Sequence, residues 1–171
     1  GTLRLIRPPS DASGDTGFVR PSTIRANTRA VVVGDVGDDR VVVLDTIGAI
    51  QRRIGSRGRG PAELLGVSHL ALRDSSILIG DAYNGRVSEF AFDGRFMGAF
   101  TAGFAAGAIG ANNHEVFAAS RSGDFYATRL THDDSPSDAF RRPAFKRSSA
   151  SERWTRLVGH DLLATDSIRT W

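Results

Sequence analysis

The chain has 171 residues, enough for one domain with its own hydrophobic core, and a formal net charge of +3. It contains no cysteine, so disulfide bonds and thiolate metal sites are excluded. No apolar run approaches the roughly 18 residues that a membrane-spanning helix needs, and so small a charge argues against a surface that tracks phosphates.

The first well-marked elements are three short strands within residues 31–54. A β-branched run ends at Gly34 and Asp35, and a second run covers residues 40–44. After another turn, residues 49–54 alternate loosely between apolar and polar side chains. No segment keeps a 3.6-residue apolar period, so we expect an all-β chain with little helix.

This pattern returns without a gap in residues 77–100, at an offset of 46 residues. The same offset carries residues 14–26 onto residues 60–72, where a further strand is expected at 67–72. Short strands in a unit of about 45 residues are typical of β-propeller blades. The marked positions that repeat are Gly34 with Gly80, Asp35 with Asp81, and Arg40 with Arg86.

The two aspartates are expected where the second strand of each copy ends. A carboxylate at that point can accept hydrogen bonds from the amides of the turn. It can also accept from the arginine five residues later, which is Arg40 for Asp35 and Arg86 for Asp81. We therefore interpret both aspartates as structural.

The glycine-rich stretch IGSRGRGPAELL, residues 54–65, lies between the two copies. A dinucleotide-binding loop needs a strand before it and a helix after it, whereas strand and turn patterns follow here. An RNA-binding arginine-glycine segment needs several repeats interleaved with aromatic residues. We therefore expect a connector between copies, and neither a nucleotide cofactor nor a nucleic-acid partner.

Later copies fade. Residues 115–130 repeat a two-strand hairpin with Ser122 and Gly123 at its turn, and residues 160–171 resemble the opening of another copy. Residues 131–153 are polar, and we expect an exposed insertion there. We predict a single domain over residues 1–171. Its copies are expected at about 14–59, 60–105, 106–130 and 154–171.

These residues resemble the NHL-repeat type of six-bladed β-propeller. The residues that carry the resemblance, over residues 14–100, are Gly58, Gly60, Pro61, Glu63, Asp81, Asn84, Arg86, Val87, Phe90, Asp93 and Gly94. Leu64 stands where that pattern has phenylalanine, and the resemblance is poor beyond Leu130. Similar bacterial proteins are usually exported, often to the periplasm, and mostly act as binding platforms. The resemblance thus implies an extracytoplasmic protein, and a leader removed before Gly1 would fit.

Six blades of this length need on the order of 270 residues, whereas 171 residues hold fewer than four copies. We therefore expect an incomplete, open propeller of about three to four blades. An open arc leaves sheet faces uncovered, and uncovered apolar faces usually mark partner sites.

Aromatic and arginine side chains near the C-terminus are the candidate partner contacts, because these residue types commonly anchor protein interfaces. They are Phe140, Arg141, Arg142, Phe145, Trp154 and Trp171.

Four histidines are present, and none has the spacing of a metal-binding motif. Some propellers of this type are lyases or hydrolases whose channel metal is held by histidines from different blades. Only His69 and His114, 45 residues apart, have that spacing. His69 falls in a predicted strand and His114 in a predicted turn, so we favour separate structural roles and expect no metal and no cofactor.

The sequence therefore favours a non-enzymatic scaffold subunit, extrinsic to the membrane and periplasmic. Its expected partners are subunits of a larger assembly, such as a bacterial photosynthetic or respiratory complex. Two alternatives stay open. One is a propeller lyase or hydrolase with a channel metal, and the other is a sensor of small ligands or glycans with a pocket near Asp35 and Asp81.

Overall fold

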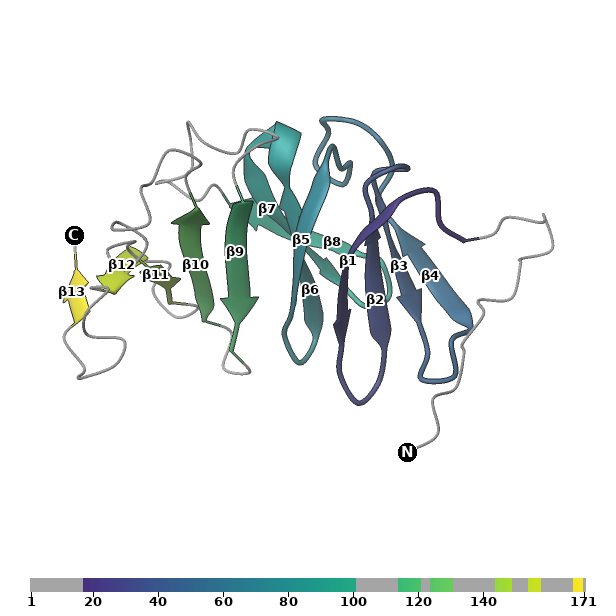
Figure 1. The fold of residues 1–171 in the computed structure, drawn as a ribbon, viewed down its shortest axis with the longest axis horizontal. Helices are drawn as coiled ribbons and strands as arrows, with labels where there is room; N and C mark the ends of the chain where they lie inside the picture. The colour runs from purple at the N-terminus through teal and green to yellow at the C-terminus, as the bar shows by residue number, and fades with distance from the viewer. Residues whose placement is uncertain are drawn as a thin grey trace.

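The structure is a computed structural model that describes residues 17–100, 114–120, 124–130, 144–148, 154–157 and 168–170. These residues form three antiparallel sheets that follow one another along the chain (Figure 1). The helical structure among them is a single short 3-10 turn, η1, at Ala82–Asn84. No helix of the described part is long and apolar enough to cross a membrane.

The first and second sheets have the same four-stranded design, with the strands in chain order. The first sheet consists of β1 (Pro21–Ala26), β2 (Val31–Asp35), β3 (Arg40–Leu44) and β4 (Ile50–Ile54). The second consists of β5 (Val67–Leu72), β6 (Ser76–Asp81), β7 (Arg86–Ala91) and β8 (Phe96–Phe100). Strands β6 to β8 fall 46 residues after β2 to β4.

The third sheet has five strands, again in chain order. They are β9 (His114–Ala119), β10 (Phe125–Leu130), β11 (Ala144–Arg147), β12 (Trp154–Leu157) and β13 (Ile168–Thr170). Strand β11 lies inside residues 131–153, where the sequence predicted an insertion, and β13 pairs with β12 at the outer edge of the sheet. The boundaries of the later copies stay predictions.

The first strands of the three sheets, β1, β5 and β9, lie side by side, and the later strands of each sheet extend away from them (Figure 1). Among the described residues, β1 has such a neighbour only on the side of β5, whereas β5 has one on each side. The described sheets thus form an open arc. The predicted all-β, incomplete propeller is confirmed.

The main core lies between the first and second sheets, because alternate strand residues point to the same face. Val32, Val41, Val43 and Ile54 of the first sheet pack against Leu70, Ile77, Ile79 and Phe90 of the second. Both surfaces consist of β-branched, leucine and aromatic side chains, which are the residues that the repeat places at alternate positions.

Gly34 allows the two sheets to approach closely at the end of β2. A Cβ atom at this position would lie 2.8 Å from Cγ1 of Val67 on β5, closer than real side chains come. The hydroxyl of Ser22 on β1 also donates a hydrogen bond, 3.3 Å long, to the carbonyl of Val67. The first strands of the two sheets are therefore in direct contact.

The opposite face of the second sheet packs on the third sheet. Ala71, Leu78 and Val87 meet Phe125 of β10, with Phe100 alongside. The rings of Phe100 and Phe125 are arranged edge to face with their centroids 5.3 Å apart, a favourable geometry for aromatic pairs. The second sheet is therefore covered on both faces, as the middle blade of an arc must be.

We predict that Phe90→Ala lowers the free energy of unfolding by about 3–5 kcal/mol, because truncating a buried phenylalanine leaves a cavity. Phe90 is 1% exposed and packs edge to face on Phe96. Urea denaturation followed by circular dichroism measures the change. Met97→Ala on neighbouring β8 is the control, since this side chain is 46% exposed and should change stability by no more than about 0.5 kcal/mol. Equal effects of the two substitutions would contradict the assigned core.

Candidate interaction surface

Asp35 fixes the segment that leads into the first sheet. Its buried carboxylate accepts hydrogen bonds from the backbone N–H groups of Val19 and Arg20, both at 2.7 Å, and of Gly37 at 3.1 Å. Arg40, which the sequence offered as its partner, instead forms an ion pair of 2.9 Å with Asp38. Asp35 therefore serves backbone amides, with no ion pair to Arg40.

Asp81 holds the equivalent place in the second sheet and is also fully buried. It accepts a hydrogen bond of 2.7 Å from the N–H of Leu65, which lies 46 residues after Val19. Here the arginine five residues on does pair with the carboxylate: Nε of Arg86 lies 2.9 Å from Oδ2 of Asp81. The side-chain amide of Asn84 donates to the same carboxylate.

Arg86 and Asn84 extend this network to the glycine-rich connector. One guanidinium nitrogen of Arg86 donates to the carbonyl oxygens of Gly60, at 2.6 Å, and Glu63, at 2.7 Å. Asn84 donates to the carbonyl of Gly58 at 3.0 Å. The connector is therefore held in place through its backbone carbonyls, so this glycine-rich stretch has a structural role between the two sheets.

Glu63 packs closely on the glycines of the connector. Its carboxylate accepts a hydrogen bond of 2.6 Å from the N–H of Gly60, and a Cβ atom at Gly58 would collide with that carboxylate. Gly60 and Glu63 also share a backbone hydrogen bond. The stretch around residues 56–66 is thus a compact loop closed on one glutamate.

Asp39 links the first sheet to this connector, and sequence reasoning missed it. Its buried carboxylate accepts from the N–H of Gly66 at 2.6 Å and from Nε of Arg57 at 2.8 Å. Its backbone is left-handed, with φ of 50°, where the repeat has Gly85 with φ of 65°. An aspartate standing where the next copy has glycine was the available signal, because the conformation costs a non-glycine residue on the order of 1 kcal/mol.

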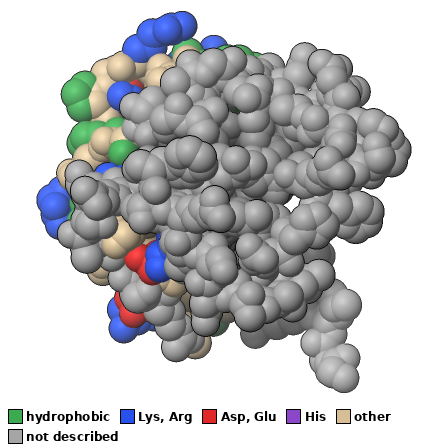
Figure 2. All heavy atoms as spheres, turned by 90° about the vertical axis from the view of Figure 1, so that its left-hand side faces the viewer, with side chains coloured by type: hydrophobic (Ala, Val, Ile, Leu, Met, Phe, Trp, Pro, Cys, Tyr) green, Lys and Arg blue, Asp and Glu red, His purple; other side chains and the backbone are tan. Residues whose placement is uncertain are grey.

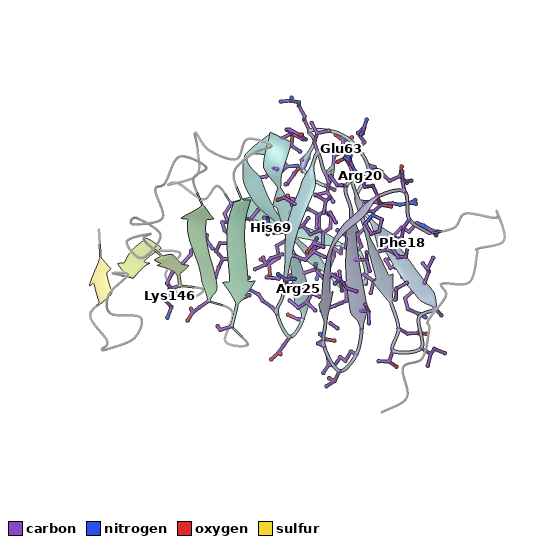
Figure 3. All side chains as sticks on the ribbon, in the orientation of Figure 1. Phe18, Arg20, Arg25, Glu63, His69 and Lys146 are labelled. Carbon is purple, nitrogen blue, oxygen red and sulfur yellow. The ribbon has the colours of Figure 1, made fainter. Side chains whose placement is uncertain are left out.

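These contacts define the connector edge of the molecule, which comprises residues 19–20, 36–39, 56–66 and 82–85 and lies at the top of Figure 1. Arg20 and Glu63 mark it in Figure 3. The carboxylates of Asp35, Asp39 and Asp81 are buried in it and bonded to amides and guanidinium groups. Neither the Asp35 nor the Asp81 carboxylate is exposed, so these two side chains cannot themselves contact a ligand, and a sensor pocket lined by the loops around them stays a prediction.

The open end of the arc is at β1. Ile24 of β1 and Leu70 of β5 occupy the same place in the repeat, 46 residues apart. Leu70 is completely buried against the preceding sheet, whereas Ile24 is 59% exposed. The two strands differ in the same way along their length, since β1 is almost wholly exposed and β5 mostly buried.

The exposed part of this end is limited to the inner strand. Ile24 on β1 pairs with Val33 on β2, and Val33 pairs with Val42 on β3, so the three side chains lie on the same face of the sheet. Val33, Val42 and Leu44 on that face are buried, and Phe18 packs against them. Among the described residues of this sheet face, Ile24 is thus the large apolar side chain that is exposed to solvent.

The predicted partner contacts near the C-terminus are only partly placed. Phe140, Arg141, Arg142 and Trp171 lie outside the described residues. The backbone of Phe145 lies in β11 opposite Ala127, and that of Trp154 lies in β12 opposite Arg147. The structure therefore brings these two positions into one sheet, on neighbouring strands.

The two histidines at blade spacing lie on adjacent strands. His69 is half-buried on β5, and His114 begins β9, so the prediction of a turn at His114 is wrong. Strands β5 and β9 are neighbours, and His69 marks this region in Figure 3. No group of three or more potential metal ligands occurs among the described residues.

The described basic side chains do not gather into one patch on the face shown in Figure 2, where they are scattered among apolar and neutral groups. A concave site instead lies at the edge opposite the connectors. It is a groove of about 520 Å³ between the β1–β2 turn and the β5–β6 turn. Its lining residues are Ala26, Asn27, Thr28, Arg29, Leu72, Arg73 and Asp74.

Comparison with known proteins identifies the architecture but no family. No family model matches the chain, and no curated protein matches it. Among solved structures, a Bacteroides fragilis protein inferred to be exported is similar, with a TM-score of 0.56 and 14% identity over 82% of this chain and 46% of that one. A streptogramin B lyase is similar with a TM-score of 0.51 and 12% identity, over 91% of this chain and 55% of the lyase.

Both of these structures are propeller-like, so this chain has a β-propeller architecture. At such low identity the likeness concerns the fold alone. The chain spans about half the length of each. A chain of about half their length agrees with the three sheets that the structure describes, because a complete propeller contains more than three sheets.

We predict that Asp39→Ala lowers stability by on the order of 2 kcal/mol, because the buried N–H of Gly66 loses its acceptor. Asp39→Gly should recover about 1 kcal/mol of that loss, because glycine adopts the left-handed backbone without strain. Thermal and urea unfolding of both variants measure the difference. Full stability of the alanine variant would contradict the link between the sheets, and equal stabilities of the two variants would contradict the strain at Asp39.

Proposed function

We propose that this protein is a non-enzymatic interaction subunit whose open arc is completed by a protein partner. The observation that carries the proposal is the contrast between Ile24, 59% exposed, and its repeat equivalent Leu70, completely buried. Leu70 is covered by the apolar face of a neighbouring sheet. The surface that fits Ile24 is therefore an apolar β-sheet face of the same kind, which we assign to a separate subunit.

Burial supplies the driving force for this contact. Covering an isoleucine side chain contributes about 1.5–3 kcal/mol, and neighbouring Pro21 and Ala26 on β1 are also exposed. Exposed apolar groups on an inner strand are what a partner site requires, whereas scattered single residues elsewhere on the surface need no such explanation. The buried carboxylates of the connector edge contribute little, because they are bonded to groups of the protein itself.

The setting that we propose is extracytoplasmic, with the protein as an extrinsic, periplasmic subunit of a bacterial membrane assembly, such as a photosynthetic or respiratory complex. One finding supports this proposal: a structure with a similar fold is inferred to be exported. The partners would then be subunits of that assembly.

We predict that Ile24→Arg weakens binding of the partner at least about tenfold, since the variant loses the apolar burial of Ile24 and also places an unpaired charge in the contact. Tagged wild-type and variant chains are incubated with detergent-solubilised membranes of the source organism, and bound proteins are quantified by mass spectrometry. Ile47→Arg is the matched control, because Ile47 is 74% exposed in the β3–β4 turn.

The result that supports the proposal is a set of proteins retained by wild type and Ile47→Arg but lost with Ile24→Arg. The same proteins retained equally by all three chains would contradict a partner site at β1. Circular dichroism of the three chains checks that each is folded.

The alternative function is a lyase or hydrolase with a channel metal, and the adjacency of β5 and β9 is the observation that favours it. Two histidines are too few to hold such an ion, because catalytic sites of this kind use about three protein ligands. The described residues supply no such third ligand beside His69 and His114. The described part of the chain therefore does not by itself supply the donor set of a metal centre.

We expect the purified, dialysed protein to hold less than one divalent ion per chain by mass spectrometry of the metals, and His69→Ala to leave that content unchanged. The expectation follows from the incomplete ligand set. One tightly held ion per chain in the wild type, released by His69→Ala, would overturn the scaffold proposal in favour of the metal-dependent enzyme. Ser68→Ala, next along β5, is the control for local damage.

A further inference from the structure

We propose that the groove between the β1–β2 and β5–β6 turns binds a small zwitterion, an α-amino acid with an aliphatic side chain. This inference does not require the partner proposed at β1, although Ala26 borders both sites. The groove measures about 520 Å³, within the range of small-molecule sites. The site is carried by two charges, Arg29 on one wall and Asp74 on the other.

The repeat builds the two walls of the groove. Residues 26–29 and residues 72–75 are equivalent, 46 positions apart, and each forms the turn of a sheet's innermost hairpin. The spacing between the walls is therefore set by the packing of the first sheet on the second. That packing is fully buried, so the groove is a fixed feature of the fold.

Both walls are held in shape by hydrogen bonds. The side-chain oxygen of Asn27 accepts from the N–H groups of Arg29 and Ala30, each at 2.9 Å. On the other wall, Arg73 is paired with Glu89 at 2.8 Å, and the hydroxyl of Ser76 donates to the same carboxylate. The turns thus present their remaining groups from a rigid frame, which lowers the entropic cost of binding.

Arg29 and Asp74 are left available by this arrangement. Within the described residues neither side chain has an ion-pair partner, and they do not pair with each other across the groove. Together with the paired Arg73 and Glu89, the groove has no net charge. The proposed ligand therefore carries one carboxylate and one ammonium group, one for each wall, because a ligand with a single charge would leave the other wall without a partner.

The bidentate guanidinium of Arg29 suits the carboxylate of the ligand, and the carboxylate of Asp74 suits its ammonium group. Ala26 and Leu72 provide the apolar lining. Leu72 is half-buried against the main core, so a short aliphatic side chain on the ligand would cover its exposed part. These features together select an α-amino acid such as leucine.

The test is titration of the ¹⁵N-labelled wild-type protein with L-leucine, followed by NMR. We expect saturable shifts at the amides of residues 26–29 and 72–75, with Kd of about 1 mM or tighter. Two probes lack one charge each: 4-methylpentanoate has no ammonium group and 3-methylbutylamine has no carboxylate. Each should bind at least about tenfold more weakly, because one charge-assisted contact is lost.

Arg29→Ala and Asp74→Asn test the two walls separately, and both sites are exposed, so folding should be preserved. Each should weaken leucine binding at least about tenfold, whereas Arg52→Ala, an exposed arginine on β4 outside the groove, should not. The absence of saturable shifts with leucine would overturn the inference. Shifts confined to other residues would also overturn it. So would equal binding of leucine and the singly charged probes, a result that is obtained with the wild-type protein alone.

Discussion

In the first and second sheets, a buried carboxylate at the end of the second strand fixes how the sheet begins. Asp35 and Asp81 each hold the backbone of the segment that leads into the first strand of their own sheet. Leaving such amides without acceptors inside the protein costs about 1–3 kcal/mol each, so the connector has few alternatives. Asp39 adds a bond from the first sheet to Gly66, immediately before β5. The position of the second sheet relative to the first is therefore set by backbone hydrogen bonds as well as by the apolar core.

Residues at equivalent positions of the repeat differ in burial because their sheets have different neighbours. Leu70 and Ile24 hold the same register in their sheets, and their side chains are chemically close, yet one is buried and the other exposed. The difference lies in what surrounds them, because β5 lies between two other first strands and β1 has a neighbour on one side among the described residues. A repeat protein must cover its terminal faces with polar residues or with a neighbour. An exposed isoleucine on the terminal inner strand agrees with the second solution.

The repeat made much of the fold predictable from the sequence. Strands β2 to β4 and β6 to β8 follow from the offset of 46 residues and the alternation of apolar positions, and the glycine-rich stretch follows as a connector. What could not be predicted was that residues at equivalent positions of the repeat make different contacts. Arg86 holds the connector, but its equivalent Arg40 pairs with Asp38, because Asp35 already receives three backbone amides. Asp39 was missed because its role joins two copies, whereas the alignment compares each copy with the next. The third sheet was hard to predict because β11 to β13 are three or four residues long and are separated by long segments.

The connector edge and the opposite, hairpin edge of the arc consequently differ in which side chains are available to bind another molecule. At the connector edge the carboxylates of Asp35, Asp39 and Asp81 are buried and bonded to backbone amides and arginines, so changing them alters the fold before it alters recognition. At the opposite edge the turns are closed by Asn27 and by the Arg73–Glu89 pair, which leaves Arg29 and Asp74 outside the structural network. Sequence reasoning passed over both residues because charged side chains in turns are common and neither repeats at the offset. Recognition by this protein should therefore occur at the inner strand of the open end and at the hairpin edge, where side chains are not already committed to holding the sheets together.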